Sequence, residues 1–203
     1  MKSTLRSLFL VVIFILSAWQ SEANHGAAAD IYYEYLSPLT YRFHLVLYQD
    51  CGPSSSFANG NPETIQGSSV STGMSISITV DTTGNNTKKV YGDLCPNINN
   101  WCTDPNSPFP GYEEWHYTGV VVLPGAATDW RFVWSSCCRN AGISNLTGPT
   151  GLGMSVTAGL NNVVRPINNS AFLSVKPIPY VCVNQPKTYL NGPLDPDFDS
   201  LVF

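Results

Sequence analysis

The sequence predicts an all-β fold: a disulfide-stapled β-sandwich of immunoglobulin-like or jelly-roll-like type, with almost no helix once a signal peptide is removed. Three observations predict it. Apolar and polar residues alternate in successive short runs, the chain contains six cysteines, and no stretch combines helical periodicity with capping residues. Roughly seven to ten short strands separated by turn residues are typical of such sandwiches.

The central strand is expected to carry the largest apolar side chains. Trp130, Phe132 and Trp134 occupy alternate positions, so a strand places all three on one face. The adjacent Cys137 and Cys138 follow directly. Neighbouring cysteines do not easily bond to each other, so these two are predicted to reach different partners.

The other expected strands share this period-two pattern and end at Gly, Pro, Asn or Asp. They are predicted at 31–36, 41–48, 74–80, 88–91, 112–123, 152–158, 172–175 and 180–183. Ser, Asn and Gly dominate 54–73, which predicts an exposed loop. Four prolines between 92 and 111 predict a second loop.

The cysteines predict three disulfides, because their number is even and all of them follow the predicted signal peptide. They are Cys51, Cys95, Cys102, Cys137, Cys138 and Cys182. Cys95 and Cys102 flank a turn-like segment, so a local bridge between them is the first choice. The other bridges are expected to join Cys51 and Cys182 to the adjacent pair, in either order. A zinc site is the weaker alternative, since there is no C-x-x-C pair.

The N-terminal 23 residues resemble a secretory signal peptide in their basic start, apolar run and small residues before a cleavage point. An uncleaved anchor is the alternative, but the apolar run is short for a bilayer. No transmembrane segment is expected in the mature chain. The predicted divisions are a signal peptide at 1–23, a β-sandwich domain at 24–186, and a linker with the truncated start of a cadherin-like repeat at 187–203.

Charge excludes one class of partner. Cleavage leaves eight basic and thirteen acidic residues, a formal charge of −5, and no basic cluster larger than Lys88-Lys89. Nucleic acid is therefore not expected as a partner.

Catalysis is not expected either, because no G-x-S-x-G, H-E-x-x-H or phosphate-loop motif occurs. His44 and His116 lie singly in predicted strands and are interpreted as surface or packing residues. Glu113 and Glu114 are adjacent, so a strand points them to opposite faces and they cannot act as a facing pair.

A binding role has more support. Trp101, Phe109 and Tyr112 lie in or beside the proline-rich loop, and loop aromatics of β-sandwiches can stack on sugar rings. The alternative, that these side chains fold back over the core, is the favoured one.

Several stretches together resemble one group of proteins. They are Tyr48-Gln49-Asp50-Cys51, Val121-Val122-Leu123-Pro124, Cys137-Cys138-Arg139-Asn140 and Pro179-Tyr180-Val181-Cys182. The group is the large secreted surface proteins of Bacteroidetes, often labelled gliding motility-associated or carrying a type IX secretion sorting domain. The chain resembles their N-terminal module. The resemblance implies a secreted, extracellular location on the cell surface of a Gram-negative bacterium.

The acidic C-terminal stretch resembles the D-P-D-G-D-S-L motif that opens cadherin-like repeats, with Phe198 where that motif has Gly. Asp195, Asp197 and Asp199 could supply oxygen ligands to Ca²⁺, the one possible cofactor. An acidic linker is the favoured alternative.

The expected function is that of an exported, non-enzymatic module of a cell-surface protein with a structural or adhesive role. Its expected partners are downstream repeats of the same full-length protein, and surface glycans or other cell-surface proteins. The alternatives are a carbohydrate-binding module and an accessory domain of a secreted hydrolase.

Overall fold

The computed structural model describes residues 26–52, 58–82, 88–91, 99–109, 111–137, 139, 143, 145–176, 184, 186 and 188–201. The predicted signal peptide and the predicted strand at 180–183 lie outside these residues. Within them, no helix has the length and apolar character needed to cross a membrane.

The described residues form ten strands and one short 3₁₀ turn, Pro149–Gly151. The strands are β1 Gly26–Ser37, β2 Thr40–Asp50, β3 Glu63–Ser68, β4 Ser75–Val80, β5 Lys88–Tyr91, β6 Tyr112–Val122, β7 Trp130–Ser136, β8 Met154–Leu160, β9 Phe172–Leu173 and β10 Pro193–Leu194. The all-β prediction is confirmed.

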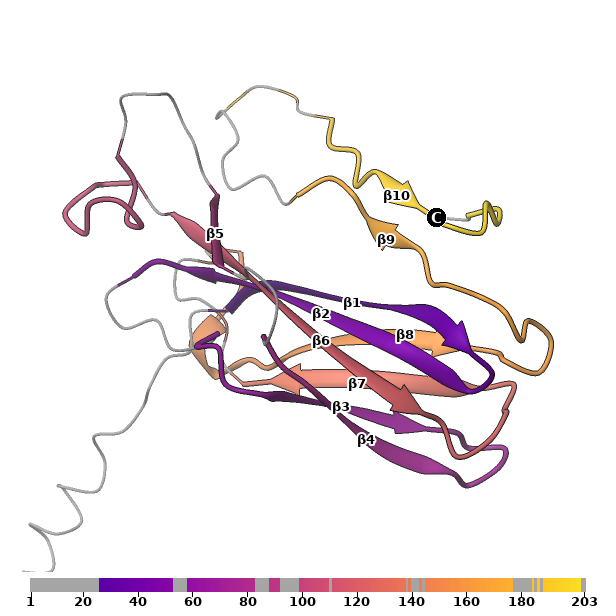
Figure 1. Cartoon of the computed structure of the whole chain (residues 1–203). Helices are drawn as coiled ribbons and strands as arrows, with labels where there is room; N and C mark the ends of the chain where they lie inside the picture. The colour runs from indigo at the N-terminus through magenta and orange to yellow at the C-terminus, as the bar shows by residue number, and fades with distance from the viewer. Residues whose placement is uncertain are drawn as a thin grey trace, which may run out of the picture.

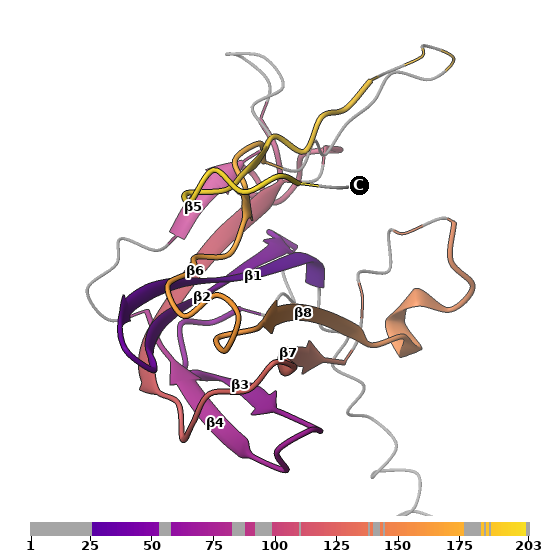
Figure 2. The ribbon, with the colours of Figure 1, turned by 90° about the vertical axis from the view of Figure 1, so that its right-hand side faces the viewer.

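Eight of the strands make two antiparallel sheets that lie one above the other (Figures 1 and 2). The first sheet has the order β1-β2-β6-β5, and the second has the order β4-β3-β7-β8. These are the ABED and C′CFG orders of an immunoglobulin-type sandwich. Of the two predicted types, immunoglobulin-like and jelly-roll-like, the strand order matches the immunoglobulin-like one.

The aromatic stripe predicted on β7 lies in the core. Trp130, Phe132 and Trp134 are 1%, 0% and 2% exposed, and β7 is an interior strand between β3 and β8. The Phe132 ring lies 4.5 Å from the ring of Phe43 in the facing sheet. Burying an aromatic side chain of this size contributes roughly 1.5–3 kcal/mol. The prediction of a central strand at this position is confirmed.

β3 corrects the sequence interpretation, because it lies inside the predicted loop at 54–73. Its inward positions are Ile65 and Gly67, so only one apolar side chain marks the buried face. A Cβ at Gly67 would lie 2.7 Å from Phe132 Cε1 and 2.9 Å from Ile76 Cγ2. The strand therefore needs glycine there, and glycine hides the period-two pattern that reveals a strand.

A third layer covers the outer face of the first sheet (Figures 1 and 2). After β8 the chain turns back, and residues 168–176, here called the C-terminal strap, run beside β1. β10 pairs with β9 in the strap, although 187–203 was predicted as a linker. On β2, the outward-facing His44, Val46 and Tyr48 are only 6–8% exposed.

Candidate functional site

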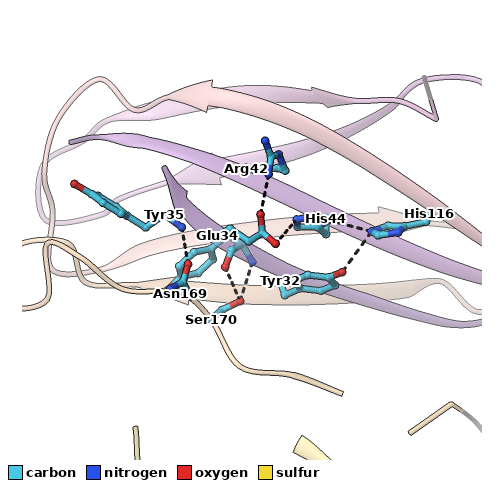
Figure 3. Close-up of polar contacts among 9 residues, drawn as sticks. Tyr32, Glu34, Tyr35, Arg42, His44, His116, Asn169 and Ser170 are labelled. Atoms are coloured by element: carbon cyan, nitrogen blue, oxygen red, sulfur yellow. Dashed lines mark hydrogen bonds and ion pairs between the residues drawn. The ribbon is translucent and has the colours of Figure 1, made fainter. Parts of the chain in front are cut away.

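The outer face of the first sheet carries a cluster of polar and aromatic side chains at its centre (Figure 3). Tyr32 and Glu34 come from β1, Arg42 and His44 from β2, and His116 from β6. Strand register brings them together, because residue 44 pairs with residue 32 on one side and residue 46 pairs with residue 116 on the other. Side chains on one face of neighbouring strands lie within reach of each other at such diagonal positions.

The two histidines form the middle of the cluster. His44 Nδ1 lies 3.0 Å from His116 Nε2, a hydrogen bond in which one nitrogen carries the proton and the other accepts it. The other nitrogen of His44, Nε2, lies 3.5 Å from Glu34 Oε1. Arg42 Nη1 donates to Glu34 Oε2 at 3.0 Å. A line of contacts thus runs from a guanidinium through a carboxylate to the imidazole pair.

Tyr32 covers this pair from the strap side. Its ring stacks on the His44 ring with centroids 4.4 Å apart and planes 6° apart. Its hydroxyl lies 3.4 Å from His116 Nε2. The ring of Phe172, from the strap, packs 5.6 Å from the ring of Tyr32. The histidine pair is therefore enclosed between the sheet and the strap.

Burial controls the protonation of the cluster. It lowers the pKa of His44 from the usual 6.5, against the attraction of Glu34 and with the help of the neighbouring His116. Burial, reinforced by Glu34 and Asp30, raises the pKa of Tyr32 to about 12. Near neutral pH, His44 is therefore neutral and Tyr32 keeps its hydroxyl proton.

The strap is fastened at both of its ends. Tyr33 N donates to Ser170 Oγ at 2.8 Å and Ser170 N donates to Tyr33 O at 3.0 Å, so the strap satisfies the free edge of β1. Tyr35 N donates to Asn169 Oδ1 at 2.8 Å. Farther along, Lys176 Nζ lies 2.6 Å from Glu114 Oε2, whose side chain is 7% exposed.

The histidine pair can bind a proton and share it between two nitrogens. Across the described part of the chain, no group of three or more His, Cys, Asp or Glu lies so as to hold a metal ion.

The predicted ligand-binding aromatics lie around one loop. Trp101 N donates to Phe109 O at 3.0 Å, and the Trp101 indole nitrogen donates to Ser107 O at 2.7 Å. Trp101 is therefore half-buried and tied into its own loop, whereas Phe109 is 40% exposed. Tyr112, at the start of β6, is half-buried, and burial raises its pKa. Of the three, Phe109 is the one most open to a ligand.

The predicted local bridge between Cys95 and Cys102 is wrong, because Cys102 is bonded to Cys51. The reason is strand pairing: β2 and β6 run antiparallel, so Cys51 N reaches Gly111 O at 2.9 Å. The loop before β6 folds back and places Cys102 beside Gly111. The same bond corrects the expected bridge from Cys51 to the adjacent cysteines.

The rest of the disulfide prediction is tested only in part. Cys137 is disulfide-bonded, as predicted for the residue that follows β7. Cys95, Cys138 and Cys182 lie outside the described residues.

The three aspartates suggested for Ca²⁺ have separate partners. Asp197 accepts hydrogen bonds from Asn169 N at 2.6 Å and from Asn169 Nδ2 at 2.8 Å. Asp195 accepts one from Asp197 N at 2.8 Å, and Asp199 lies 3.8 Å from Arg165. The acidic stretch thus holds the strap residue that caps β1.

Sequence reasoning missed the histidine pair because it treated His44 and His116 as isolated residues. The available signal was that both lie on polar positions of predicted strands. Without the pairing of β2 with β6, nothing in the sequence places them side by side. Glu113 and Glu114 do have different partners, as expected: Gln49 and Trp115 for the first, Lys176 for the second.

Comparison with known proteins adds no relative. No protein-family profile, curated protein or solved structure matches this chain significantly. The resemblance to Bacteroidetes surface proteins therefore stays a prediction.

Proposed function

We propose that this chain is an exported, non-enzymatic module of a cell-surface protein, with a structural or adhesive role. The observation that carries the proposal is the immunoglobulin-type strand order together with the disulfide between Cys51 and Cys102. Disulfides persist in oxidising compartments, and sandwiches of this architecture recur in cell-surface domains. The sequence resemblance supports a location on a Gram-negative cell surface, with downstream repeats of the same protein as neighbours.

The two ends of the sandwich differ in a way that supports adhesion. Cys51, Cys102 and Cys137 are bonded at the end where β2 and β7 stop. At the opposite end, Val70 in the β3–β4 turn is 91% exposed and Val164 after β8 is 66% exposed. Exposed apolar side chains in the loops at one end of a sandwich can form an interaction site.

The segments that carry Val70 and Val164 are both hydrogen-bonded to the loop between β6 and β7. Ser71 Oγ donates to Asp129 Oδ1 at 2.6 Å, which fixes the turn that carries Val70. Asn162 N donates to Ala127 O at 3.2 Å, which fixes the start of the segment that carries Val164. The exposed valines thus project from anchored backbone, which lowers the entropy lost on binding.

Adhesion of protein-coated beads to Gram-negative cells tests the proposal. We expect beads coated with the wild-type chain to bind more cells than albumin-coated beads. The double variant Val70→Asp, Val164→Asp should lose most of this binding. The matched control is Leu190→Asp, which changes a residue 75% exposed on another part of the chain. Binding no higher than that of albumin would contradict the adhesive role, and full binding by the double variant would show that another surface adheres.

A second candidate, carbohydrate binding, is favoured by the exposed Phe109 on a loop pinned by a disulfide. A rigid loop aromatic can stack on a sugar ring without a large entropic cost. A glycan array probed with the wild-type chain, Phe109→Ala and Trp101→Ala tests it. Sugar binding lost in Phe109→Ala would support this candidate. Trp101→Ala should disturb the loop as well, because it removes the indole bond to Ser107.

A further inference from the structure

We propose that the C-terminal strap is a pH-sensitive latch, held down at neutral pH by the hydrogen-bonded His44–His116 pair beneath it and released when the pair takes up protons. The inference is independent of the adhesive role. It rests on the geometry of the pair, on its contact with the strap through Tyr32, and on the charges around it.

The geometry of the pair limits how many protons it can hold. His44 Nδ1 and His116 Nε2 lie 3.0 Å apart, which leaves room for one hydrogen atom between them. A first added proton can be accepted at His44, because its Nε2 faces Glu34. A second proton would set N–H against N–H and two like charges against each other. The pair must then separate.

The side chain of Tyr32 links the histidine pair to the strap, so movement of the pair displaces the strap. Tyr32 stacks on His44, its hydroxyl lies beside His116, and its ring carries Phe172 of the strap. Neither imidazole can move far without displacing Tyr32. Packed aromatic contacts do not deform gradually, so loss of the stack removes the support under Phe172.

The charged groups around the pair act in both directions: Glu34 favours a proton on His44, whereas His116 and Arg42 oppose it, and burial has the largest effect. Glu34 on β1 attracts a proton, but Arg42 on β2 is bound to that carboxylate. Lys176 in the strap is paired with Glu114 on β6. Among the described side chains, the remaining titratable neighbours are Asp30 on β1 and Tyr48 on β2.

The sign of the pH effect follows from burial. His44 is 7% exposed, and burial lowers its pKa below 6.5, so the folded, latched state binds fewer protons than an open one. The latch is therefore fully closed above pH 6.5 and weakens as the pH falls through the lowered pKa. Its release uncovers the edge of β1 at Tyr33 and Tyr35, which the strap otherwise satisfies. An open strand edge can pair with another strand.

Amide hydrogen exchange measured by NMR tests the latch. Ser170 N donates to Tyr33 O and so reports the strap, whereas Phe132 N, in β7, reports the core. After correction for intrinsic exchange, we expect protection at Ser170 to fall as the pH is lowered from about 6.5 to about 5, by up to roughly tenfold per pH unit for each extra proton that the open state binds. Protection at Phe132 should not change over this range.

Three variants separate the latch from ordinary acid unfolding. The double variant His44→Gln, His116→Gln cannot titrate at these positions, so Ser170 protection should lose its pH dependence. His116→Gln leaves His44 able to titrate but removes the second imidazole, so it should reduce the pH dependence without abolishing it. Lys176→Met loosens the strap at every pH and should lower the protection while leaving its pH slope intact. His116→Gln keeps a side-chain amide beside His44, which makes it the variant least disturbing to the fold.

Three results would overturn the proposal. One is equal Ser170 protection at both ends of the pH range in the wild-type chain. Another is a pH slope that survives unchanged in the double variant His44→Gln, His116→Gln. The third is loss of Phe132 protection in parallel with Ser170, which would mean that acid unfolds the whole sandwich.

Discussion

Replacing Gly67 with alanine should destabilise the sandwich at its centre. The new Cβ would lie 2.7 and 2.8 Å from two carbons of Phe132 and 2.9 Å from Ile76 Cγ2, all well inside van der Waals contact. Phe132 cannot retreat easily, because it is fully buried, stacks 5.6 Å from Trp130 and packs 4.5 Å from Phe43.

The magnitude follows from two opposing effects. Overpacking a well-packed core costs about 1–3 kcal/mol. Replacing glycine inside a strand recovers about 0.5–1 kcal/mol, because alanine restricts the unfolded chain. We therefore expect a net loss of about 1–2 kcal/mol, or about 2–4 °C in Tm per kcal/mol for a chain of this size.

Chemical denaturation followed by tryptophan fluorescence measures this loss. The matched control is Gly159→Ala in β8, where the nearest atom to the new Cβ is Trp130 O at 4.0 Å. This control should be neutral or slightly stabilising. If Gly67→Ala were as stable as Gly159→Ala, the close approach of β3 to Phe132 would be refuted.

Two other changes act on particular bonds. Asp129 accepts hydrogen bonds from Ser69 and Ser71, which hold its pKa at about 2, below the usual 3.8. The stabilisation by the ionised Asp129 carboxylate is present above pH 3.8 and is lost as the pH falls towards 2. Asp129→Asn should therefore reduce the loss of stability between pH 3.8 and pH 2. Identical stability–pH curves for the wild-type chain and Asp129→Asn would contradict this. Cys102→Ser removes the disulfide to Cys51, which spans 51 residues of sequence, and should lower the free energy of unfolding by roughly 2–5 kcal/mol. An unchanged melting temperature would show that the disulfide does not form.

The strands could be predicted where large apolar side chains occupy alternate positions. β7 has three aromatic residues at such positions, and β4 has Ile76, Ile78 and Val80. β3 could not be predicted, because its close packing requires a residue without a side chain at position 67. Periodicity thus reveals burial only where burial uses a large apolar side chain.

The candidate site was out of reach for another reason. The contact between His44 and His116 depends on the register of β2 with β6, and its burial depends on a strap that arrives from residues 168–176. The disulfide shows the same limit: Cys95 is nearer to Cys102 in sequence, but strand pairing places Cys51 beside it. Contacts between distant segments follow from register, which a single sequence does not specify.

Peptide mapping of the unreduced chain by mass spectrometry tests the central claim, a sandwich stapled where β2 meets the loop before β6. We expect a linked pair of peptides containing Cys51 and Cys102, together with a disulfide at Cys137. A linked pair containing Cys95 and Cys102, or free thiols at Cys51 and Cys102, would contradict it.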